Sequence, residues 1–288
     1  MSPRIWTTLE VLRWTGGRFA EQGIESARVD AELLLAQVLG TTRVGLYTAH
    51  DRPLGESELA AFRELVKRRL AGEPVAYLRG EQEFWSLPLH VDARVLIPRP
   101  DTETLVEVVL RAARMLPRGP IRIADVCTGS GAIAIALARE LPEAQVVATD
   151  LSRDALDVAR RNVARHAVEA RVTLREGDLT APLDGEFAII AANPPYVARE
   201  ELASLAVEVR CEPRGALDGG PGGLDLIARL VAAALPLLTP GGTLAIEHGA
   251  TQGAAVRELC GRAGLVDAST ANDLAGHERV TSARRASP

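Results

Sequence analysis

The sequence of 288 residues lacks several features that mark particular classes of protein. No apolar run approaches the roughly 18 residues that a membrane-spanning helix needs. The first residues show no charged stretch followed by an apolar core, so we expect no secretory signal. Hydrophobic residues make up 47% and charged residues 25%, a balance that excludes a disordered chain. We therefore expect a folded cytoplasmic protein with no membrane partner.

An excess of positive charge is also missing. Lysine and arginine together number 33 against 38 acidic residues, which gives a formal net charge of -5, and Lys67 is the only lysine. Proteins that bind nucleic acid duplexes usually carry a clear excess of basic residues. The charge balance therefore argues against bulk nucleic-acid binding, and we expect no direct nucleic acid partner.

Residues that could bind a metal are few and scattered. The three cysteines, Cys127, Cys211 and Cys260, form no CxxC pair, which is typical of reduced thiols. None of the five histidines lies three or four residues from another histidine or a cysteine. We therefore predict no metal site.

The first part of the chain has helical patterns. Apolar residues recur at helical spacing near residues 9–19, 30–39 and 57–70, with Ser57 as the expected N-cap of the last helix. Residues 84–91 alternate as a hairpin would. Residues 96–103 then contain two prolines, and Asp101 or Thr102 could cap a helix over residues 103–115. This run is either an interdomain linker or a rigid lip over an active site.

From Ile121 onward, strand and helix patterns alternate. Strands are predicted at 121–126, 145–150, 171–174, 187–192 and 243–247, and helices at 131–140, 154–167, 224–238 and 251–263. This alternation predicts an α/β fold whose parallel sheet is covered on both faces. Ligands of such sheets bind beyond the carboxyl ends of the strands.

The first strand leads into a glycine-containing loop that is expected to bind a ligand. Cys127, Thr128, Gly129, Ser130 and Gly131 follow it, and their two glycines allow a sharp turn that leaves room for a ligand. The spacing GxGxxG of a dinucleotide site is not met. The acid that precedes the loop, Asp125, would repel phosphate but suit a cationic amino group.

Two further acids follow the next strands. Asp150 ends the second strand, where an acid can accept both hydroxyls of a ribose. Asp178 follows the third strand and could reach an adenine amino group. A nucleoside with a positive charge and no phosphate describes S-adenosylmethionine. Taken singly, Asp150 could instead cap a helix and Asp178 could be a turn residue.

The motif Asn193-Pro194-Pro195-Tyr196 follows the fourth strand. It could be an ordinary turn. It also suits a specific reaction, because an amide or ring-amino nitrogen is a poor nucleophile whose lone pair is delocalised. The Asn193 side-chain oxygen and the Pro194 carbonyl could accept its two hydrogens, and Tyr196 could stack on a planar group. Such a site would align and stabilise a direct in-line methyl transfer.

These motifs together resemble a known family. The NPPY motif is shared by DNA adenine-N6 methyltransferases and by the protein glutamine-N5 methyltransferases that modify peptide chain release factors. The second branch is also matched by residues 83–89 (EFWSLPL), 96–103 (LIPRPDTE), 212–213, 216–217, 247–249 (EHG) and 278–280 (ERV). The chain therefore resembles the peptide chain release factor N5-glutamine methyltransferases, the PrmC/HemK family, most firmly over residues 74–280.

The resemblance implies a fold and a domain organisation. It implies a class I S-adenosylmethionine-dependent methyltransferase fold, a Rossmann-like seven-stranded sheet preceded by a small helical bundle. The expected domains are residues 1–75, a helical domain that recognises the release factor; 76–104, a β-hairpin linker; and 105–288, the catalytic domain.

It also implies a substrate and a set of site residues. The substrate would be the glutamine of the Gly-Gly-Gln motif in class 1 release factors, and the product of the cofactor would be S-adenosylhomocysteine. Asn193, Pro194, Pro195 and Tyr196 would hold the glutamine. The cofactor would contact Asn193 and the residues Cys127, Thr128, Gly129, Ser130, Gly131, Asp150, Asp178 and Leu179.

Some residues depart from the family pattern or allow a second interpretation. Cys127 replaces a common glycine, and Leu179 replaces a frequent aromatic that would stack on adenine. We interpret Cys127 as a small packing residue rather than a nucleophile, and His248 as a structural residue rather than a general base. The stretch 219–223 (GGPGG) lacks the Lys-Ser/Thr of a phosphate loop, so we expect a flexible loop near the substrate entrance.

Two other functions remain open at this point. A DNA or RNA adenine-N6 methyltransferase would need a basic groove and a pocket for a flipped base. A non-catalytic nucleotide-binding partner of the ribosome machinery would not need the Asn193 side chain for its effect.

Overall fold

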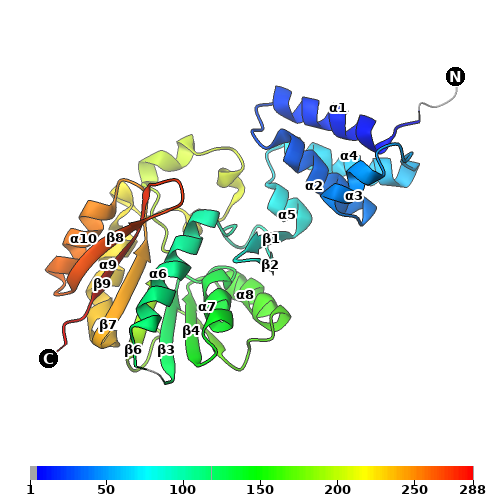
Figure 1. Cartoon of the computed structure of the whole chain (residues 1–288). Coiled ribbons are helices and arrows are strands. Elements are labelled where there is room, and N and C mark those ends of the chain that lie inside the picture. Colours follow the sequence, from blue (N-terminus) through cyan, green and yellow to red (C-terminus); the bar gives the residue numbers. More distant parts are fainter. Residues whose placement is uncertain (1–4, 118, 288) are drawn as a thin grey trace. The chain divides into compact units, whose positions relative to one another are not determined.

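The computed structural model describes residues 5–117 and 119–287. Its described residues form two compact units (Figure 1). The first unit comprises the residues up to Glu81 together with the distant segment Val207–Cys211. The second unit comprises Gln82–Ala206 and the residues from Glu212 onward.

The first unit is a bundle of helices. They are α1 (Thr8–Glu21), α2 (Ala27–Leu39), α3 (Arg43–Thr48), α4 (Glu56–Leu70) and α5 (Val75–Arg79). Its core contains fully buried side chains such as Phe19, Leu34 and Leu35. We predicted Ser57 as the N-cap of α4, but the N-cap is Gly55, two residues earlier. The Gly55 amide donates a hydrogen bond of 2.9 Å to the Glu58 side chain. Ser57 lies inside the first turn.

A buried arginine holds the distant segment in this unit. Arg69 of α4 is 3% exposed and donates to Asp30 of α2 at 2.7 Å. It also donates to Glu208 at 2.6 Å. The planar guanidinium can bond two carboxylates at once, which a lysine could not do with the same geometry.

The second unit contains a sheet of seven strands. They are β3 (Ile121–Val126), β4 (Ala144–Asp150), β5 (Val172–Glu176), β6 (Phe187–Ala192), β7 (Leu238–Glu247), β8 (Val266–Asn272) and β9 (Glu278–Arg284). Their order is β5-β4-β3-β6-β7-β9-β8. The chain builds outward from β3 to β5 and then returns to place β6 on the other side of β3. That change of direction creates a crevice at the carboxyl ends of β3 and β6.

The sheet is not wholly parallel, contrary to the prediction from alternation. The strands from β3 to β7 pair in parallel, whereas β9 pairs antiparallel with both β7 and β8. The strands β8 and β9 read as DAS and TSA in their middles, so no apolar run marks them in the sequence. They become strands through pairing, since β9 pairs with the edge of β7 and β8 pairs with β9.

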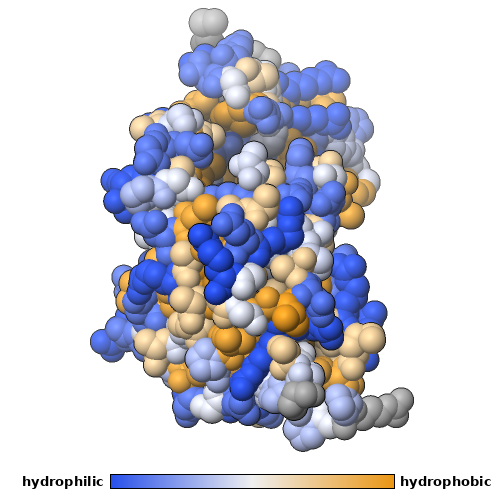
Figure 2. Space-filling view, turned by 90° about the vertical axis from the view of Figure 1, so that its left-hand side faces the viewer, coloured by the Kyte–Doolittle hydropathy of each residue, from blue (hydrophilic) through white to orange (hydrophobic). Residues whose placement is uncertain are grey.

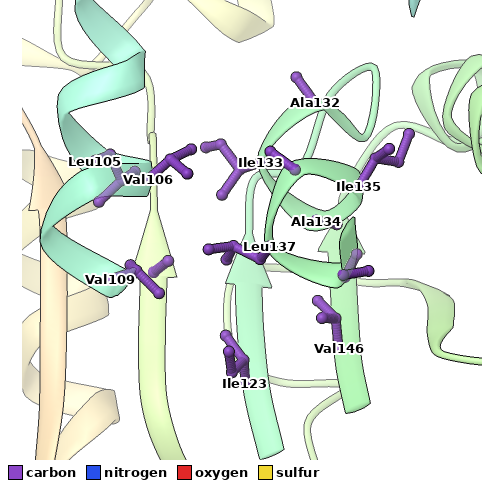
Figure 3. Packing of buried hydrophobic residues seen from close by; sticks show 14 of the residues in the cluster. Leu105, Val106, Val109, Ile123, Ala132, Ile133, Ala134, Ile135, Leu137 and Val146 are labelled. Atoms are coloured by element: carbon purple, nitrogen blue, oxygen red, sulfur yellow. The ribbon is translucent and has the colours of Figure 1, made fainter. Parts of the chain in front are cut away.

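Helices pack against the sheet because successive strand residues alternate between its faces. The helices α6 (Glu103–Arg114), α7 (Ala132–Glu140) and α8 (Arg153–Arg165) contribute to a first core with Ile123 and Ile189. Figure 3 shows side chains of α7 gathered above β3 and β4, with the side chains of α6 on the neighbouring side, next to β6. The helices α9 (Asp225–Ala234) and α10 (Gly253–Arg262) contribute to a second core with Val126 and Ile190.

The second unit also has a short hairpin and several short helical turns. The hairpin consists of β1 (Glu81–Phe84) and β2 (Leu87–His90). A hairpin is confirmed, but the predicted range 84–91 included only the last residue of β1. One 3-10 turn, η1 (Pro100–Thr102), leads directly into α6. Hydrophilic and hydrophobic residues are interspersed on the face drawn in Figure 2. Within residues 5–117 and 119–287, no helix is both long and apolar enough to cross a membrane.

Candidate active site

A cavity of about 400 Å³ lies at the carboxyl ends of the parallel strands. Its volume is in the range of small-molecule sites. Segments that follow β3, β4, β5 and β6 all contribute to its wall, as expected for this edge of the sheet. Eight of the predicted cofactor residues line it, namely Cys127, Thr128, Gly129, Ser130, Asp150, Asp178, Leu179 and Asn193.

The loop after β3 turns through left-handed backbone conformations. Cys127, Gly129 and Gly131 have φ angles of 62°, 55° and 83°. Gly131 is not among the lining residues and begins α7 instead; a Cβ there would approach the Cβ of Ala159 to 3.3 Å. This glycine therefore permits close helix packing, while Gly129 and its neighbours form the wall.

Asp150 joins this loop to the end of β4. Its Oδ2 accepts a hydrogen bond of 2.8 Å from the Gly129 amide, and its Oδ1 accepts one of 2.9 Å from the Ser152 amide. Burial raises the pKa of Asp150, and these backbone bonds oppose the rise. The Leu151 amide also bonds this carboxylate, and because its two oxygens can accept about four hydrogen bonds in all, acceptor capacity remains for a ligand hydroxyl.

Asp125 does not face the cavity, contrary to the expectation that it would suit a cationic ligand. It is fully buried behind the loop, where Oδ2 accepts hydrogen bonds from the Thr128 hydroxyl at 2.6 Å and the Ala134 amide at 3.1 Å. Its Oδ1 accepts no hydrogen bond from the described residues. Burial raises the pKa of Asp125 to about 7. The residue therefore supports the loop from within.

The residues after β5 form another part of the wall. Asp178 is partly exposed and forms an ion pair with Arg229 of α9. Leu179 has a left-handed backbone with φ 48°, and its carbonyl accepts a hydrogen bond of 2.9 Å from the Thr149 hydroxyl. Its side chain is 8% exposed and packs in the second core. Leu179 thus presents a fixed apolar surface.

The NPPY motif follows β6 beside this cavity. Asn193 and Pro195 line the cavity, whereas Pro194 and Tyr196 are not among the lining residues. Nδ2 of Asn193 donates to the Thr102 hydroxyl at 3.3 Å. The phenol of Tyr196 donates to Glu247 at 3.2 Å, and burial raises the pKa of Tyr196. A stacking role for Tyr196 stays a prediction.

The proline-rich segment closes one side of the cavity. Val95, Leu96, Pro98 and Thr102 line it, so of the two interpretations the structure favours the lip. Thr102 occupies the N-cap position of α6 but makes no side-chain cap. The lip is fixed by the buried Glu212, which accepts a hydrogen bond of 3.0 Å from the Ile97 amide and forms an ion pair with Arg99.

Sequence reasoning missed several wall residues, and it assigned no role to one buried acid, Glu247, which it quoted only within the EHG match. Pro213 and Ala216 line the cavity although only their family resemblance had been noted, and Gly215 and Leu226 of α9 had not been singled out. Glu247 ends the apolar strand β7 and is 1% exposed. A carboxyl at the end of a buried apolar run was the signal that could have identified it.

Three other interpretations can be compared with the structure. Both ring nitrogens of His248 lie 2.9 Å from protein oxygens, the Gly249 carbonyl and the Thr281 hydroxyl, which agrees with a structural role. Burial raises the pKa of the Cys127 thiol, which argues against a nucleophile. No group of three or more potential metal ligands occurs in the described part of the chain.

The glycine-rich stretch is closely packed at its two ends, whereas Pro221 and Gly222 in its middle are exposed. Its flexibility stays a prediction. A Cβ on Gly219 would come within 2.8 Å of the Pro195 carbonyl, and one on Gly223 within 2.2 Å of the Tyr196 carbonyl. The Gly219 amide donates to the Val197 carbonyl at 2.9 Å. The missing side chains therefore allow this stretch to support the NPPY turn by direct backbone contact.

Comparisons with known proteins agree with this arrangement. Residues 10–80 match the family described as the PrmC N-terminal domain, and residues 102–220 match the methyltransferase small domain. The chain is 48% identical to the release factor glutamine methyltransferase of Geobacter sulfurreducens, with 98% of each chain covered. It is 43% identical to that of Rhodopirellula baltica, with 98% of this chain and 97% of the relative covered.

Solved structures share the fold. A methyltransferase from Pyrococcus furiosus superposes with a TM-score of 0.51 at 17% identity, covering 76% of this chain and 97% of that one. A 16S rRNA methyltransferase of T. thermophilus, solved with AdoMet and guanosine, gives 0.52 at 20% identity, covering 71% and 49%. These likenesses show a methyltransferase fold.

Proposed function

Because the chain belongs to the release factor glutamine methyltransferase family, we propose that it methylates the side-chain nitrogen N5 of the glutamine in the Gly-Gly-Gln motif of class 1 peptide chain release factors. It is an S-adenosylmethionine-dependent protein methyltransferase with a class I fold and an N-terminal helical domain. The observation that carries the proposal is the cavity, which brings Asn193 together with Asp150 and the loop after β3.

The cavity wall suits S-adenosyl-L-methionine as the methyl donor. The carboxylate of Asp150 favours a ligand with positive charge, and its remaining acceptor capacity can bind ribose hydroxyls. Asp178, which also pairs with Arg229, would reach the adenine amino group. Leu179 offers an apolar surface for the adenine. When bound, the cofactor supplies a methyl group on a positively charged sulfonium, and S-adenosyl-L-homocysteine remains after transfer.

The NPPY turn would hold the glutamine amide through its two hydrogens. Since Nδ2 of Asn193 is engaged by Thr102, its Oδ1 is the end that can accept one N–H. The Pro194 carbonyl would accept the other. Two fixed acceptors align the nitrogen lone pair with the methyl group and stabilise the positive charge that develops on nitrogen. Tyr196 would support the turn from behind or stack on the amide.

We propose a separate role for each of the three expected segments. Residues 1–75 would recognise the release factor, 76–104 would link the units, and 105–288 would carry the reaction. The match of residues 10–80 to the PrmC N-terminal domain supports the first assignment. An apolar groove on the helical unit also supports it, because Trp14 in its wall is 57% exposed and could contact a protein surface.

The test is a methylation assay with labelled cofactor that offers a class 1 release factor and DNA side by side. We expect label in the release factor, with mass spectrometry placing one methyl group on the Gly-Gly-Gln glutamine. Asn193→Ala should lower kcat by about a hundredfold or more, because the amide loses one of its two acceptors.

Two controls make the assay specific. A release factor with glutamate in place of that glutamine should stay unlabelled. Cofactor binding measured by calorimetry shows whether Asn193→Ala remains folded and able to bind. Label in DNA alone would contradict the proposal and favour an adenine-N6 methyltransferase.

A further inference from the structure

Thr102 is used in an unexpected way at the start of α6. A threonine at the N-cap usually accepts a hydrogen bond from the first turn of its helix. Thr102 has a helical backbone instead and makes no such bond. Its side chain is turned to the NPPY motif, where Oγ1 accepts the hydrogen bond from Nδ2 of Asn193, and the residue is 4% exposed.

Glu247 is a buried carboxyl behind the same motif. It ends β7, which lies next to β6 in the sheet, and it is 1% exposed. Tyr196 donates to its Oε1, while its Oε2 accepts no hydrogen bond from the described residues. Burying a carboxyl with so few partners costs stability. Such a cost is common where an acid serves a site.

The Thr102 hydroxyl accepts a hydrogen bond from Asn193, and it also acts on Glu247, since it lowers the pKa of that carboxyl. A hydroxyl has a single hydrogen to donate. When that hydrogen points to the carboxylate, only lone pairs face Asn193, so only the NH2 end of the amide can bond there. The amide oxygen is then left for the cavity that Asn193 lines.

We propose that Thr102 and Glu247 are positioning residues that keep the Asn193 amide oriented with its oxygen toward the substrate nitrogen. The inference rests on the proposed function, since it concerns the acceptor of the glutamine N–H. It gives the lip a task beyond closing the cavity, because Thr102 determines which end of the Asn193 amide faces the substrate. Neither residue touches the transferred methyl group in this mechanism.

The charge of Glu247 controls the arrangement. Burial raises the pKa of Glu247 to about 7, Thr102, Tyr196 and Arg279 lower it, and Asp101 adds to the rise. These groups belong to the lip, the NPPY turn and β9. A protonated Glu247 can donate to Thr102, which frees the Thr102 hydrogen to bond the Asn193 oxygen and lets the amide flip. We therefore expect kcat to increase as Glu247 ionises.

The first experiment compares threonine variants in the release factor assay. Thr102→Val keeps the shape but removes the hydroxyl, so kcat should fall about 10- to 100-fold while KM for the release factor and cofactor affinity change little. Thr102→Ser should restore most of the rate because it restores the hydroxyl. Thr104→Val, the same change two residues further along α6, should keep the rate and measures the cost of the substitution itself.

The second experiment uses the pH profile of kcat. Wild type should show a limb that rises with an apparent pKa near 7, and Glu247→Gln should lower kcat and abolish that limb. If Glu247 were purely structural, Glu247→Gln would change the unfolding midpoint but would leave the rising part of the pH profile of kcat unchanged. Glu247→Gln removes a buried charge, so we expect it to fold.

The outcomes separate the inference from the function. If wild type methylates the release factor but Thr102→Val keeps its kcat, or Glu247→Gln keeps the rising limb, the positioning role is overturned and the proposed function stands. If wild type does not methylate any release factor, both fail. Loss of rate in Thr102→Val, recovery in Thr102→Ser and loss of the limb in Glu247→Gln together support the inference.

Discussion

At the scale of single residues, the cavity is built by backbone conformations that side chains usually avoid. Cys127 and Leu179 both have positive φ angles, although neither is glycine. A left-handed residue with a Cβ costs roughly 1–2 kcal/mol. The sequence flagged both positions because they depart from the family pattern, yet it did not show that both backbones would adopt the left-handed conformation. Strain of this kind is often located at functional sites.

Substitutions at Cys127 should reveal that strain. Cys127→Gly removes the strain of the left-handed backbone, which stabilises the folded protein. It also loses the packing of the thiol and gives the unfolded chain more conformational entropy, and both of these effects destabilise the folded protein. We expect its free energy of unfolding to stay within about 1 kcal/mol of wild type. Cys127→Val should lower it by more, because a β-branched residue tolerates positive φ poorly. Urea unfolding measures both, and equal losses in the two variants would contradict this account.

The sequence predicted the members of the site better than their partners. Asn193 and Asp150 were identifiable because they follow strands whose carboxyl ends meet at one edge. The partner of Asn193 was not, since Thr102 lies 91 residues away and looked like a helix cap. Asp125 was placed on the wrong side of its loop, because a strand end does not tell whether a side chain faces the ligand or the core.

At the scale of elements, the lip depends on one buried acid. Glu212 binds the Ile97 amide and pairs with Arg99, so it fixes the segment whose Leu96 and Pro98 line the cavity. Both partners come from the motif IPRPDTE, and Glu212 comes from the segment that follows the NPPY turn. The two stretches that carried the family resemblance are thus physically joined.

Removing this acid should loosen the lip. Glu212→Ala leaves the Arg99 charge and the Ile97 amide without their acceptor, and we expect a loss of about 3 kcal/mol in the free energy of unfolding. Cofactor affinity should also fall, as calorimetry can show. Asp184→Ala is the matched control, because its ion pairs with Arg122 and Arg175 involve an exposed carboxylate. That variant should lose less than about 1 kcal/mol; similar losses would refute a special role for Glu212.

The regular elements were predictable to different degrees. Strands β3, β4 and β6 are apolar because both faces are covered, and the sequence predicted them within one residue. The antiparallel hairpin β8–β9 was missed because its residues are mostly polar. The patterns of single segments carry no information about an edge that recruits them, so the last part of the sheet could be inferred only from the family.

At the scale of the whole molecule, two buried carboxyls should make stability depend on pH. Burial raises the pKa of Asp125 from 3.8 to about 7 and that of Glu247 from 4.5 to about 7. Between about pH 4 and pH 7 the folded protein holds protons that the unfolded chain has released. Stability is therefore expected to fall as pH rises through this range. Glu32 and Asp92, whose pKa values are lowered to about 2, act only at lower pH.

The variant Asp125→Asn isolates one of these contributions. The amide oxygen can still accept from the Thr128 hydroxyl and the Ala134 amide, but no proton is taken up. Its urea midpoint should therefore change less than that of wild type between about pH 5 and pH 7.5. An identical pH dependence in the two proteins would show that Asp125 does not titrate in this range.

The short segment Val207–Cys211 affects how the protein can be truncated into its two units. It counts with the helical unit, although the residues on both sides of it belong to the other unit, so the two units are interleaved along the chain. A truncated gene that starts at residue 82 would still encode these five residues but not Arg69, to which Glu208 is bonded. Expressing the second unit alone would thus require removing Val207–Cys211 as well as the N-terminal residues. Deleting the N-terminal residues alone would leave this segment without its partner Arg69.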